Sequence, residues 1–289
     1  MSTRVCAVLI TFNRLDTLKT ALAHILAQTV RPTIVVVDNN SSDGTREYLE
    51  SLNGNENLVS IFMESNVGSA GGIAAGMKYG LSMEKLDYFW ILDDDTFYQK
   101  DALKELVENI EGSPFSLIGL SGFNIRYGNK VKTTSTDKLQ EVDYALIDGA
   151  IIKADVVRKL GTTRPGFFMM GDDHEYSLRL TKHGYKIGLL NLGQIERLYL
   201  GGAGAFTKAT LWRGYYSSRN HMLIIKQYFS FINLFAYCVR QLKFIIAAAF
   251  LAPDRFKRIK FRMLGILHGI RGIEGKTLDP KTLKFTYEE

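Results

Sequence analysis

Three adjacent carboxylates, Asp93, Asp94 and Asp95, form the pattern in this chain that most directly suggests chemistry. They follow an apolar run over residues 88–92, so a strand that buries itself ends by bringing charge to one point. Removing an ionised carboxylate from water without a partner costs free energy, so three adjacent carboxylates at the end of a buried strand call for a shared explanation. The hard cations Mg²⁺ and Mn²⁺ favour one or two carboxylates together with phosphate oxygens. The triplet therefore indicates a divalent metal site, with an acidic turn as the alternative.

A second acidic pair, Asp172 and Asp173, follows the apolar stretch 167–170 and opens a helical pattern. One interpretation is structural, because carboxylates cap helix N-termini and favour the helix dipole. The other is catalytic, because a carboxylate beside a pocket can act as the general base for an attacking sugar hydroxyl. His174 lies next to this pair and is a candidate site residue. One acidic cluster for a metal and one for a base would suffice for glycosyl transfer.

Two more polar segments suggest a nucleotide. Asp38 ends an apolar run and could accept a hydrogen bond from a base imide, although Asp and Asn in the following turn also act as caps, as Asp43 is expected to do. Residues 66–72 contain three glycines, which let backbone amides approach a diphosphate. Tight packing of a helix on a sheet is the alternative for this segment, which matches neither common phosphate-loop pattern.

The elements that must position these residues alternate along the first half of the chain. Apolar runs at 5–10, 33–37, 58–63 and 88–92 predict buried strands, and the spacing at 15–28, 45–52 and 72–83 predicts helices. This order predicts an α/β fold with a mostly parallel, doubly wound sheet. Ligands of such sheets bind beyond the carboxyl ends of the strands, where all the polar segments fall.

The second half is less regular. Strands are predicted over 117–123 and 144–152, a helix over 173–183, and a C-terminal helical extension from 211 to 267. We expect a catalytic domain over residues 1–210 and a helical region over 211–289. The polar-aromatic stretch 215–220 could line an acceptor or phosphate pocket, with Arg219 as the anion contact.

Composition sets the remaining expectations. Of 289 residues 46% are hydrophobic, enough for a sizeable core, and Cys6 and Cys238 lie in separate apolar segments, which predicts reduced thiols. No secretory signal is recognised at the N-terminus, which predicts a cytoplasmic location.

The apolar stretch 229–252 is interrupted by Arg240 and Lys243 and is followed by a basic-aromatic segment at 255–262. This pattern predicts helices at the surface of an anionic membrane rather than a span, with a packed subdomain or a homo-oligomer interface as alternatives. Nucleic acid is not an expected partner, because the basic residues match no recognised binding motif.

The chain resembles the family 2 glycosyltransferases of the GT-A fold. The segments 11–14, 38–45 and 93–95 match the opening motifs of that family in order and spacing, and the resemblance covers roughly residues 4–225. Within the family, segments 66–72, 172–176 and 215–220 look most like bacterial galactofuranosyltransferases and related rhamnosyltransferases.

The resemblance implies an inverting transfer from a UDP- or dTDP-linked sugar, with galactofuranose favoured and rhamnose as the alternative, and a requirement for Mn²⁺ or Mg²⁺. It implies a glycan or polyprenyl-lipid-linked acceptor in the synthesis of a surface polysaccharide such as O-antigen or capsule, at the inner face of the cell membrane. Asp93 and Asp95 would be the metal acids, Asp173 the catalytic base and Asp172 a sugar or acceptor contact. His174 and Arg219 would contact the acceptor or a phosphate. The donor would be bound by Thr11, Asn13, Arg14, Asp38, Asn40, Asn66, Gly68, Asp93 and Asp94.

One departure from the family pattern concerns the metal. Many relatives supply a histidine ligand shortly after the helix of the base, whereas residues 194–202 of this chain contain none, so Glu196 or water would have to substitute. Two other functions fit the sequence less well. A nucleotidyltransferase would place a Gly-rich basic loop after the first strand, where this chain has 11–14, and a non-catalytic scaffold would not need both acidic clusters.

Overall fold

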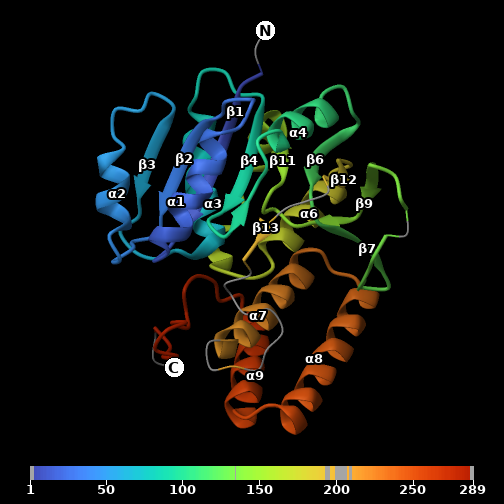
Figure 1. The fold of residues 1–289 in the computed structure, drawn as a ribbon. Helices are drawn as coiled ribbons and strands as arrows, with labels where there is room; N and C mark the ends of the chain where they lie inside the picture. Colours follow the sequence, from blue (N-terminus) through green and yellow to red (C-terminus); the bar gives the residue numbers. More distant parts are fainter. Residues whose placement is uncertain (1–2, 134, 193–195, 199–206, 208–209, 287–289) are drawn as a thin grey trace.

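The computed structural model describes residues 3–133, 135–192, 196–198, 207 and 210–286. Its centre is an eight-stranded sheet in the order β3-β2-β1-β4-β11-β6-β12-β9, with helices on both faces (Figure 1). Strands β11 and β9 run antiparallel to their neighbours, and the other pairs in this sheet are parallel. The prediction of an α/β fold with a mostly parallel sheet is confirmed.

The first half follows the predicted order of elements. Its members are β1 (Val5–Thr11), α1 (Leu15–Leu26), β2 (Thr33–Asp38), α2 (Thr45–Ser51), β3 (Leu58–Phe62), α3 (Gly68–Leu81) and β4 (Tyr88–Asp93). Every residue of β1 is buried, as a central strand covered on both faces requires. Helix α3 begins four residues before the predicted start at 72, so the glycine-rich segment forms its first turn.

The second half departs from the sequence-based expectation at two strands. It contains β5 (Thr96–Phe97), α4 (Ala102–Ile110), β6 (Phe115–Gly119), β7 (Gly122–Arg126), β8 (Asn129–Val131), β9 (Leu139–Val142), β10 (Tyr144–Ala145), β11 (Ile151–Lys153), α5 (Ala154–Leu160), the 3₁₀ turn η1 (Pro165–Phe167), α6 (Asp172–Lys182), β12 (Lys186–Leu190) and β13 (Glu196–Arg197). Single strands over 117–123 and 144–152 were wrong. Each is divided because β7 and β10 lie outside the main sheet, in a separate three-stranded sheet in which β7 pairs with both β10 and β8.

Three helices follow: α7 (Leu211–Gln227), α8 (Phe231–Leu251) and α9 (Arg255–Arg271). They lie beyond the carboxyl ends of the parallel strands (Figure 1). Helix α9 packs closely on α7 at Gly265, where a Cβ would overlap the backbone of Tyr215. The glycine therefore lets the two helix backbones approach, and α7 becomes the wall that faces the strand ends.

Alternating side chains of the central strands fill two cores. On one face of β1, Ala7 and Leu9 pack with Leu18 and Leu22 of α1. On the other face, Val8 packs in a second cluster that includes residues of α3 and α6. Burying each large apolar side chain contributes roughly 1.5–3 kcal/mol to the free energy of folding. The two cores therefore hold the ends of the strands in fixed positions. Both cysteines are free thiols, as predicted.

Candidate active site

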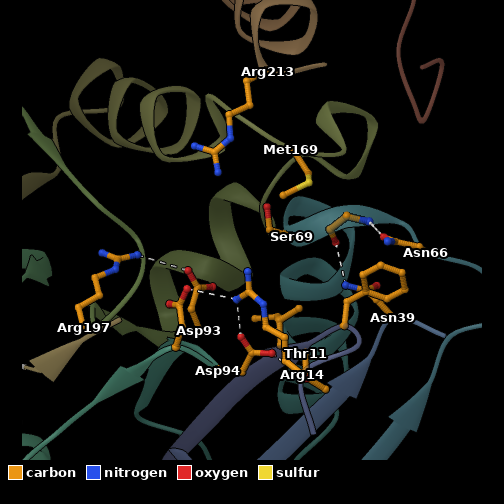
Figure 2. A pocket seen from close by; sticks show the side chains of 14 residues that line it. Thr11, Arg14, Asn39, Asn66, Ser69, Asp93, Asp94, Met169, Arg197 and Arg213 are labelled. Carbon is orange, nitrogen blue, oxygen red and sulfur yellow. Dashed lines mark hydrogen bonds and ion pairs between the residues drawn. The ribbon is translucent and has the colours of Figure 1, made fainter. Parts of the chain in front are cut away.

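The main cavity at the strand ends has a volume of about 340 Å³. It lies at the carboxyl ends of β1, β2 and β4, with α3 on one side and α7 across from the strands (Figure 2). Its lining residues are Ile10, Thr11, Phe12, Arg14, Asn39, Asn66, Gly68, Ser69, Asp93, Asp94, Asp95, Met169, Arg197 and Arg213. Predicted donor residues from three separated segments therefore meet in one place.

Asp94 is the member of the acid triplet that anchors the cluster to the first strand. The Thr11 hydroxyl donates to its Oδ2 at 2.7 Å, and Arg14 Nη1 donates to its Oδ1 at 2.8 Å. Burial raises the pKa of Asp94, and the Arg14 guanidinium and the Thr11 hydrogen bond oppose that rise. The residue is thus held by internal partners on both oxygens.

Asp93 lies at the more open side of the cluster, beside the acid Asp148. The Asp93 amide donates to Asp148 Oδ1 at 3.0 Å, and the Thr96 and Tyr98 hydroxyls also donate to Asp148. Arg197 Nη2 lies 3.0 Å from Asp148 Oδ2 and 3.6 Å from Asp93 Oδ2. Desolvation and three neighbouring carboxylates raise the pKa of Asp93 well above its usual range, while Arg197 lowers it. The cluster concentrates more negative charge than Arg197 alone balances.

Asp95 offers the clearest position for a cation. Its Oδ2 accepts from Arg14 Nη1 at 3.2 Å, whereas its buried Oδ1 has no hydrogen-bond partner. Buried carboxylate oxygens without a partner are rare and call for an explanation. Among the described residues no group of three or more His, Cys, Asp or Glu side chains surrounds a common point. The donor set of Asp95 and Asp93 thus fits a hard divalent cation that takes its other oxygens from substrate and water.

The loop after β2 is organised by hydrogen bonds of its own. Asp38 is buried and its Oδ1 accepts from the Ser41 amide at 3.0 Å, and Asn13 Oδ1 accepts from the Ser42 amide at 2.7 Å. Asn40 adopts a left-handed backbone conformation with φ of 66°. None of the three predicted donor residues lines the main cavity. They shape the loop that borders it, and their contact with a donor stays a prediction.

Asn39, which the sequence analysis did not select, lines the cavity where Asp38 does not. Its Nδ2 donates to the Gly68 carbonyl at 3.2 Å, and Asn66 Oδ1 accepts from the Gly68 amide at 2.8 Å. Gly68 has φ of 76°, and a Cβ there would overlap the carbonyl oxygen of Phe168. The turn therefore requires glycine, and it joins the loop after β2 to the segment that leads to the acidic pair.

Asp173 lies in the first turn of α6, and its carboxylate is bound on both oxygens. The Tyr144 hydroxyl donates to Oδ2 at 3.1 Å, and the Ile147 amide donates to Oδ1 at 3.3 Å. Because Ile147 precedes Asp148, the same loop connects this carboxylate to the acid cluster. Burial raises the pKa of Asp173, and the two hydrogen bonds and Lys130 oppose that rise.

Asp172 is the neighbouring carboxylate in the same first turn of α6. Burial, followed by the charge of Asp173, raises its pKa to about 7. Neither carboxylate is part of the cavity lining, although Met169, three residues before Asp172, is. The pair thus lies just behind the wall of the main cavity.

The chain leading to α6 is held in an unusual conformation. Phe168 and Met170 have φ of 61° and 73°, a left-handed region that side chains other than glycine rarely adopt. Asn220 Nδ2 of α7 lies within 2.9 Å of the carbonyl oxygens of Phe167, Met169 and Met170. Such conformations persist where surrounding structure enforces them, and they cluster at functional sites.

The predicted role of Arg219 as an anion contact was wrong. The residue is fully buried, and its Nη1 and Nη2 donate to the carbonyl oxygens of Gly275 at 2.7 Å and Phe167 at 3.0 Å. Its ring contacts with Tyr215 and Tyr216 cover the guanidinium further. Arg219 joins α7, η1 and the segment after α9, so it is a structural clamp.

His174 points to a different space. It lines a second cavity of about 230 Å³ together with His221, and the two rings are 5.2 Å apart in an edge-to-face arrangement. Burial lowers the pKa of His174 to about 4 and that of His221 to about 3, so both rings are neutral at neutral pH.

Two arginines of the main cavity were missed by the sequence analysis. Arg197 comes from β13, and Arg213 comes from the first turn of α7 and points toward the acids in Figure 2. The buried Nε of Arg213 has no hydrogen-bond partner, and burial lowers its pKa, as does the charge of Arg14. A lone arginine carries no local pattern, and only tertiary structure brings these two to the strand ends.

Glu196, considered as a replacement metal ligand, is exposed and precedes Arg197 on β13. Successive side chains of a strand point to opposite faces, so Glu196 points away from the acids that Arg197 approaches. Residues 194–195 and 199–202 of the same segment lie outside the described residues.

Solved structures share this fold. The crystal structure of Staphylococcus aureus TarS 1-349 covers 93% of this chain with a TM-score of 0.55, and the chain covers 72% of it. The structure of GalNAc-T7 with UDP, GalNAc and Mn²⁺ covers 94% of the chain and is 56% covered, with a TM-score of 0.65. Both are 14% identical in sequence, a level that supports the GT-A fold alone.

Sequence relatives are closer. The chain is 24% identical over 237 residues to a poly-beta-1,6-N-acetyl-D-glucosamine synthase of Staphylococcus aureus, a match covering 76% of the chain and 55% of that synthase. It is 28% identical over 213 residues to the galactofuranosyltransferase GlfT1 of Mycolicibacterium smegmatis, covering 64% of the chain and 67% of that enzyme. The chain thus spans about half the length of the first of these relatives.

The family model described as Glycosyl transferase family 2 matches residues 6–173. That range holds β1 to β4, the acid triplet and Asp173, and it decides against a nucleotidyltransferase. The chain belongs to glycosyl transferase family 2.

Proposed function

We propose that this glycosyltransferase moves a sugar from a nucleotide-sugar donor to a glycan or lipid-linked acceptor, with inversion at the anomeric carbon and with a divalent cation. The observation that carries the proposal is the buried Asp95 Oδ1 without a partner in a cavity that also holds Arg14, Arg197 and Arg213. Carboxylate oxygens for a cation beside guanidinium groups for phosphates form a suitable site for a nucleoside diphosphate.

Each group has a defined part in the transfer. The acceptor oxygen forms a bond to the anomeric carbon as the bond to the diphosphate breaks, and Asp173 takes the proton of the acceptor hydroxyl. The arginines hold the negative charge of the diphosphate. A cation bound by Asp93 and Asp95 would supply further neutralising charge to the leaving group. Asp172 contacts a hydroxyl of the sugar or acceptor.

For the donor, UDP-galactofuranose is favoured and dTDP-rhamnose is the alternative. Support comes from the galactofuranosyltransferase among the sequence relatives and from the UDP in a structure that shares the fold. Asp38 is the candidate contact to the base, with Asn39 beside it on the cavity side. The relatives named for polysaccharide synthesis support a role in a cell-surface polysaccharide.

The helices after residue 210 are proposed to contact the inner surface of the cell membrane, where a lipid-linked acceptor would lie. Among the described residues, α8 is the one helix long and apolar enough to cross a membrane, with mean hydropathy 1.6 over its most apolar stretch. Length and composition are shared by spanning and interfacial helices. The basic residues of α9, among them Lys257 and Lys260, favour contact with an anionic surface. We retain residues 1–210 and 211–289 as the proposed catalytic and helical regions.

A thermal-shift screen tests the donor site. We expect UDP with Mn²⁺ to raise the melting temperature more than either alone, and Asp95→Ala to abolish the metal-dependent part of the shift. Asp173→Asn should keep that shift and lose transfer, because the base acts after the donor is bound. Asp155→Asn, a change at an exposed carboxylate on α5, serves as the control.

The outcomes separate the candidates. A shift with dTDP instead of UDP would transfer the proposal to rhamnose. Wild-type transfer by Asp173→Asn would remove Asp173 from the mechanism. No metal-dependent shift with any nucleoside diphosphate would contradict the donor site and favour a scaffold that keeps the family fold.

A further inference from the structure

Asp148 lies beside the acid triplet because of the direction of one strand. Strand β11 runs antiparallel to β4, so the residues that precede β11 reach the edge of the sheet at which β4 ends in Asp93. The loop is fixed at that edge, since the Gly149 amide donates to the Ile91 carbonyl at 2.7 Å. Pairing between distant strands thus adds a fourth carboxylate to the triplet.

Both carboxylate oxygens of Asp148 are occupied by groups of the protein itself. Oδ1 accepts from the Asp93 amide at 3.0 Å and from the Tyr98 hydroxyl at 3.2 Å. Oδ2 accepts from the Thr96 hydroxyl at 2.9 Å and lies 3.0 Å from Arg197 Nη2. Burial raises the pKa of Asp148, and Arg197 and the hydrogen bonds from Asp93 and Thr96 oppose that rise. Four donors around one carboxyl group match its charged form, which only accepts hydrogen bonds.

Asp148 also differs from the triplet in its place. The triplet lines the main cavity, whereas Asp148 is not among the lining residues and its side chain is 7% exposed. With both oxygens occupied, this carboxylate is unsuited to bind a cation or a substrate directly. Its influence on the cavity is therefore exerted through its charge and through the groups that it holds.

The charges around the cavity are unequal. The neighbouring carboxylates are Asp93, Asp94, Asp95 and Asp148. In the part of the chain that the structure describes, their ion pairs are made with Arg14 and Arg197, and Arg213 adds a third positive charge to the lining. A diphosphate would bring further negative charge to these acidic surroundings. Repulsion between like charges would therefore oppose its entry unless a cation offset it.

We propose that Asp148 is a positioning residue that makes binding of the donor depend on the cation. Its charge opposes a diphosphate that enters alone and favours a divalent cation beside Asp93. Its pair with Arg197 keeps that guanidinium among the acids, 3.6 Å from Asp93 Oδ2, so less positive charge is left for phosphate. Its hydrogen bond from the Asp93 amide fixes the backbone of that acid. The inference rests on the proposed function and adds to it the residue that couples the two ligands.

The test measures UDP binding to the full chain by calorimetry, with and without Mn²⁺, and the ratio of the two affinities is the gain from the cation. Asp148→Asn keeps the shape of the side chain and removes its charge. We expect UDP to bind this variant about tenfold more tightly without Mn²⁺, and within about twofold of the unaltered chain with it, because one repelling unit charge is lost. The gain from the cation should therefore fall about tenfold.

Arg197→Gln should change binding in the opposite direction. Loss of a positive charge should weaken UDP binding without Mn²⁺ and enlarge the gain from the cation. A defect of folding alone would weaken binding in both variants, so the opposite signs separate a role in charge from a role in stability. If Asp148→Asn does not fold, Arg197→Gln decides, and a smaller gain in that variant would overturn the proposal.

Asp87→Asn is the matched control, since it makes the same change at an exposed aspartate just before β4, at the other end of the strand. Both affinities should stay within about twofold. An unchanged gain in the Asp148 variant, or weaker binding of UDP without Mn²⁺, would overturn the proposal, while a gain in the unaltered chain would leave the proposed function standing. Absence of any gain in the unaltered chain would contradict the cation of the proposed function, and the inference with it.

Discussion

Asp173 lies in surroundings that hold its carboxyl protonated to a higher pH than an exposed aspartate. Burial raises its pKa, while the Tyr144 hydroxyl and Lys130 lower it. A base must be deprotonated to accept a proton, so activity should be lost as pH falls through this raised value. The acid limb of the rate profile should therefore lie above the usual aspartate pKa of about 4.

Tyr144→Phe tests this directly, because it removes the hydroxyl and keeps the ring. Loss of the donor at Asp173 Oδ2 should raise the pKa of the carboxyl and move the acid limb of kcat/KM to higher pH. Tyr79→Phe, on the surface of α3, is the control. A limb that stays in place, or moves to lower pH, would separate the titration from Asp173.

Arg219 is predicted to matter for stability. Arg219→Leu would remove the buried guanidinium and its hydrogen bonds to the carbonyl oxygens of Gly275 and Phe167, at a cost on the order of 3 kcal/mol in the free energy of unfolding. Urea unfolding of the variant and of the unaltered chain measures this difference in the free energy of unfolding. Arg46→Leu, which breaks an exposed pair with Glu50, should cost less than about 1 kcal/mol. Equal stability with loss of transfer would restore Arg219 as a ligand contact.

At the scale of elements, the first turn of α3 joins the proposed donor cavity to the segment that leads to Asp173, the proposed base. Gly68→Ala should weaken UDP binding and lower the free energy of unfolding by on the order of 3 kcal/mol, since it adds a left-handed strain to an overlap with the Phe168 carbonyl. Gly54→Ala is the control, because Gly54 also has a positive φ of 103° but open space around it. Its cost should be about 1 kcal/mol. If both changes cost the same, packing at Gly68 does not constrain the cavity.

Sequence reasoning succeeded where the pattern is local. Strands β1, β2 and β4 are largely buried on both faces, so their residues are almost continuously apolar and their polar ends stand out. The prediction of strand boundaries failed where pairing between distant strands determines the structure. No local sequence pattern near residues 120 and 147 indicates that the chain passes from one sheet to another. The acid triplet was found for the same local reason. Residue type did not separate Arg213, which lines the cavity, from Arg219, which is fully buried.

For the whole molecule, the exposed apolar residues of α8 and α9 form a surface that needs a partner. Phe250 is 84% exposed and Phe256 is 79% exposed, near the turn that joins the two helices. We expect the chain to sediment with vesicles containing phosphatidylglycerol and to be released by about 0.5 M NaCl, because the basic residues of α9 add a screened attraction. Replacing both phenylalanines with serine should reduce binding.

Leu26→Ser, an exposed apolar change on α1, is the control for that measurement. Undiminished vesicle binding by the double variant would exclude the helix tips as the contact. If the unaltered chain is instead a dimer that the double variant dissociates, the same surface is a homo-oligomer interface.

The Arg219 clamp also bears on when the enzyme becomes active during its synthesis. The turn before α6 is held through Arg219 to the carbonyl of Gly275, and the Gly275 amide in turn donates to Gly166 at 2.6 Å. A ribosome delivers Asp173 about a hundred residues earlier, at 5–20 residues each second. For several seconds the nascent chain therefore lacks the contacts that hold the turn before Asp173. Coupling the two ends in this way delays completion of this turn until the C-terminal helices have been made.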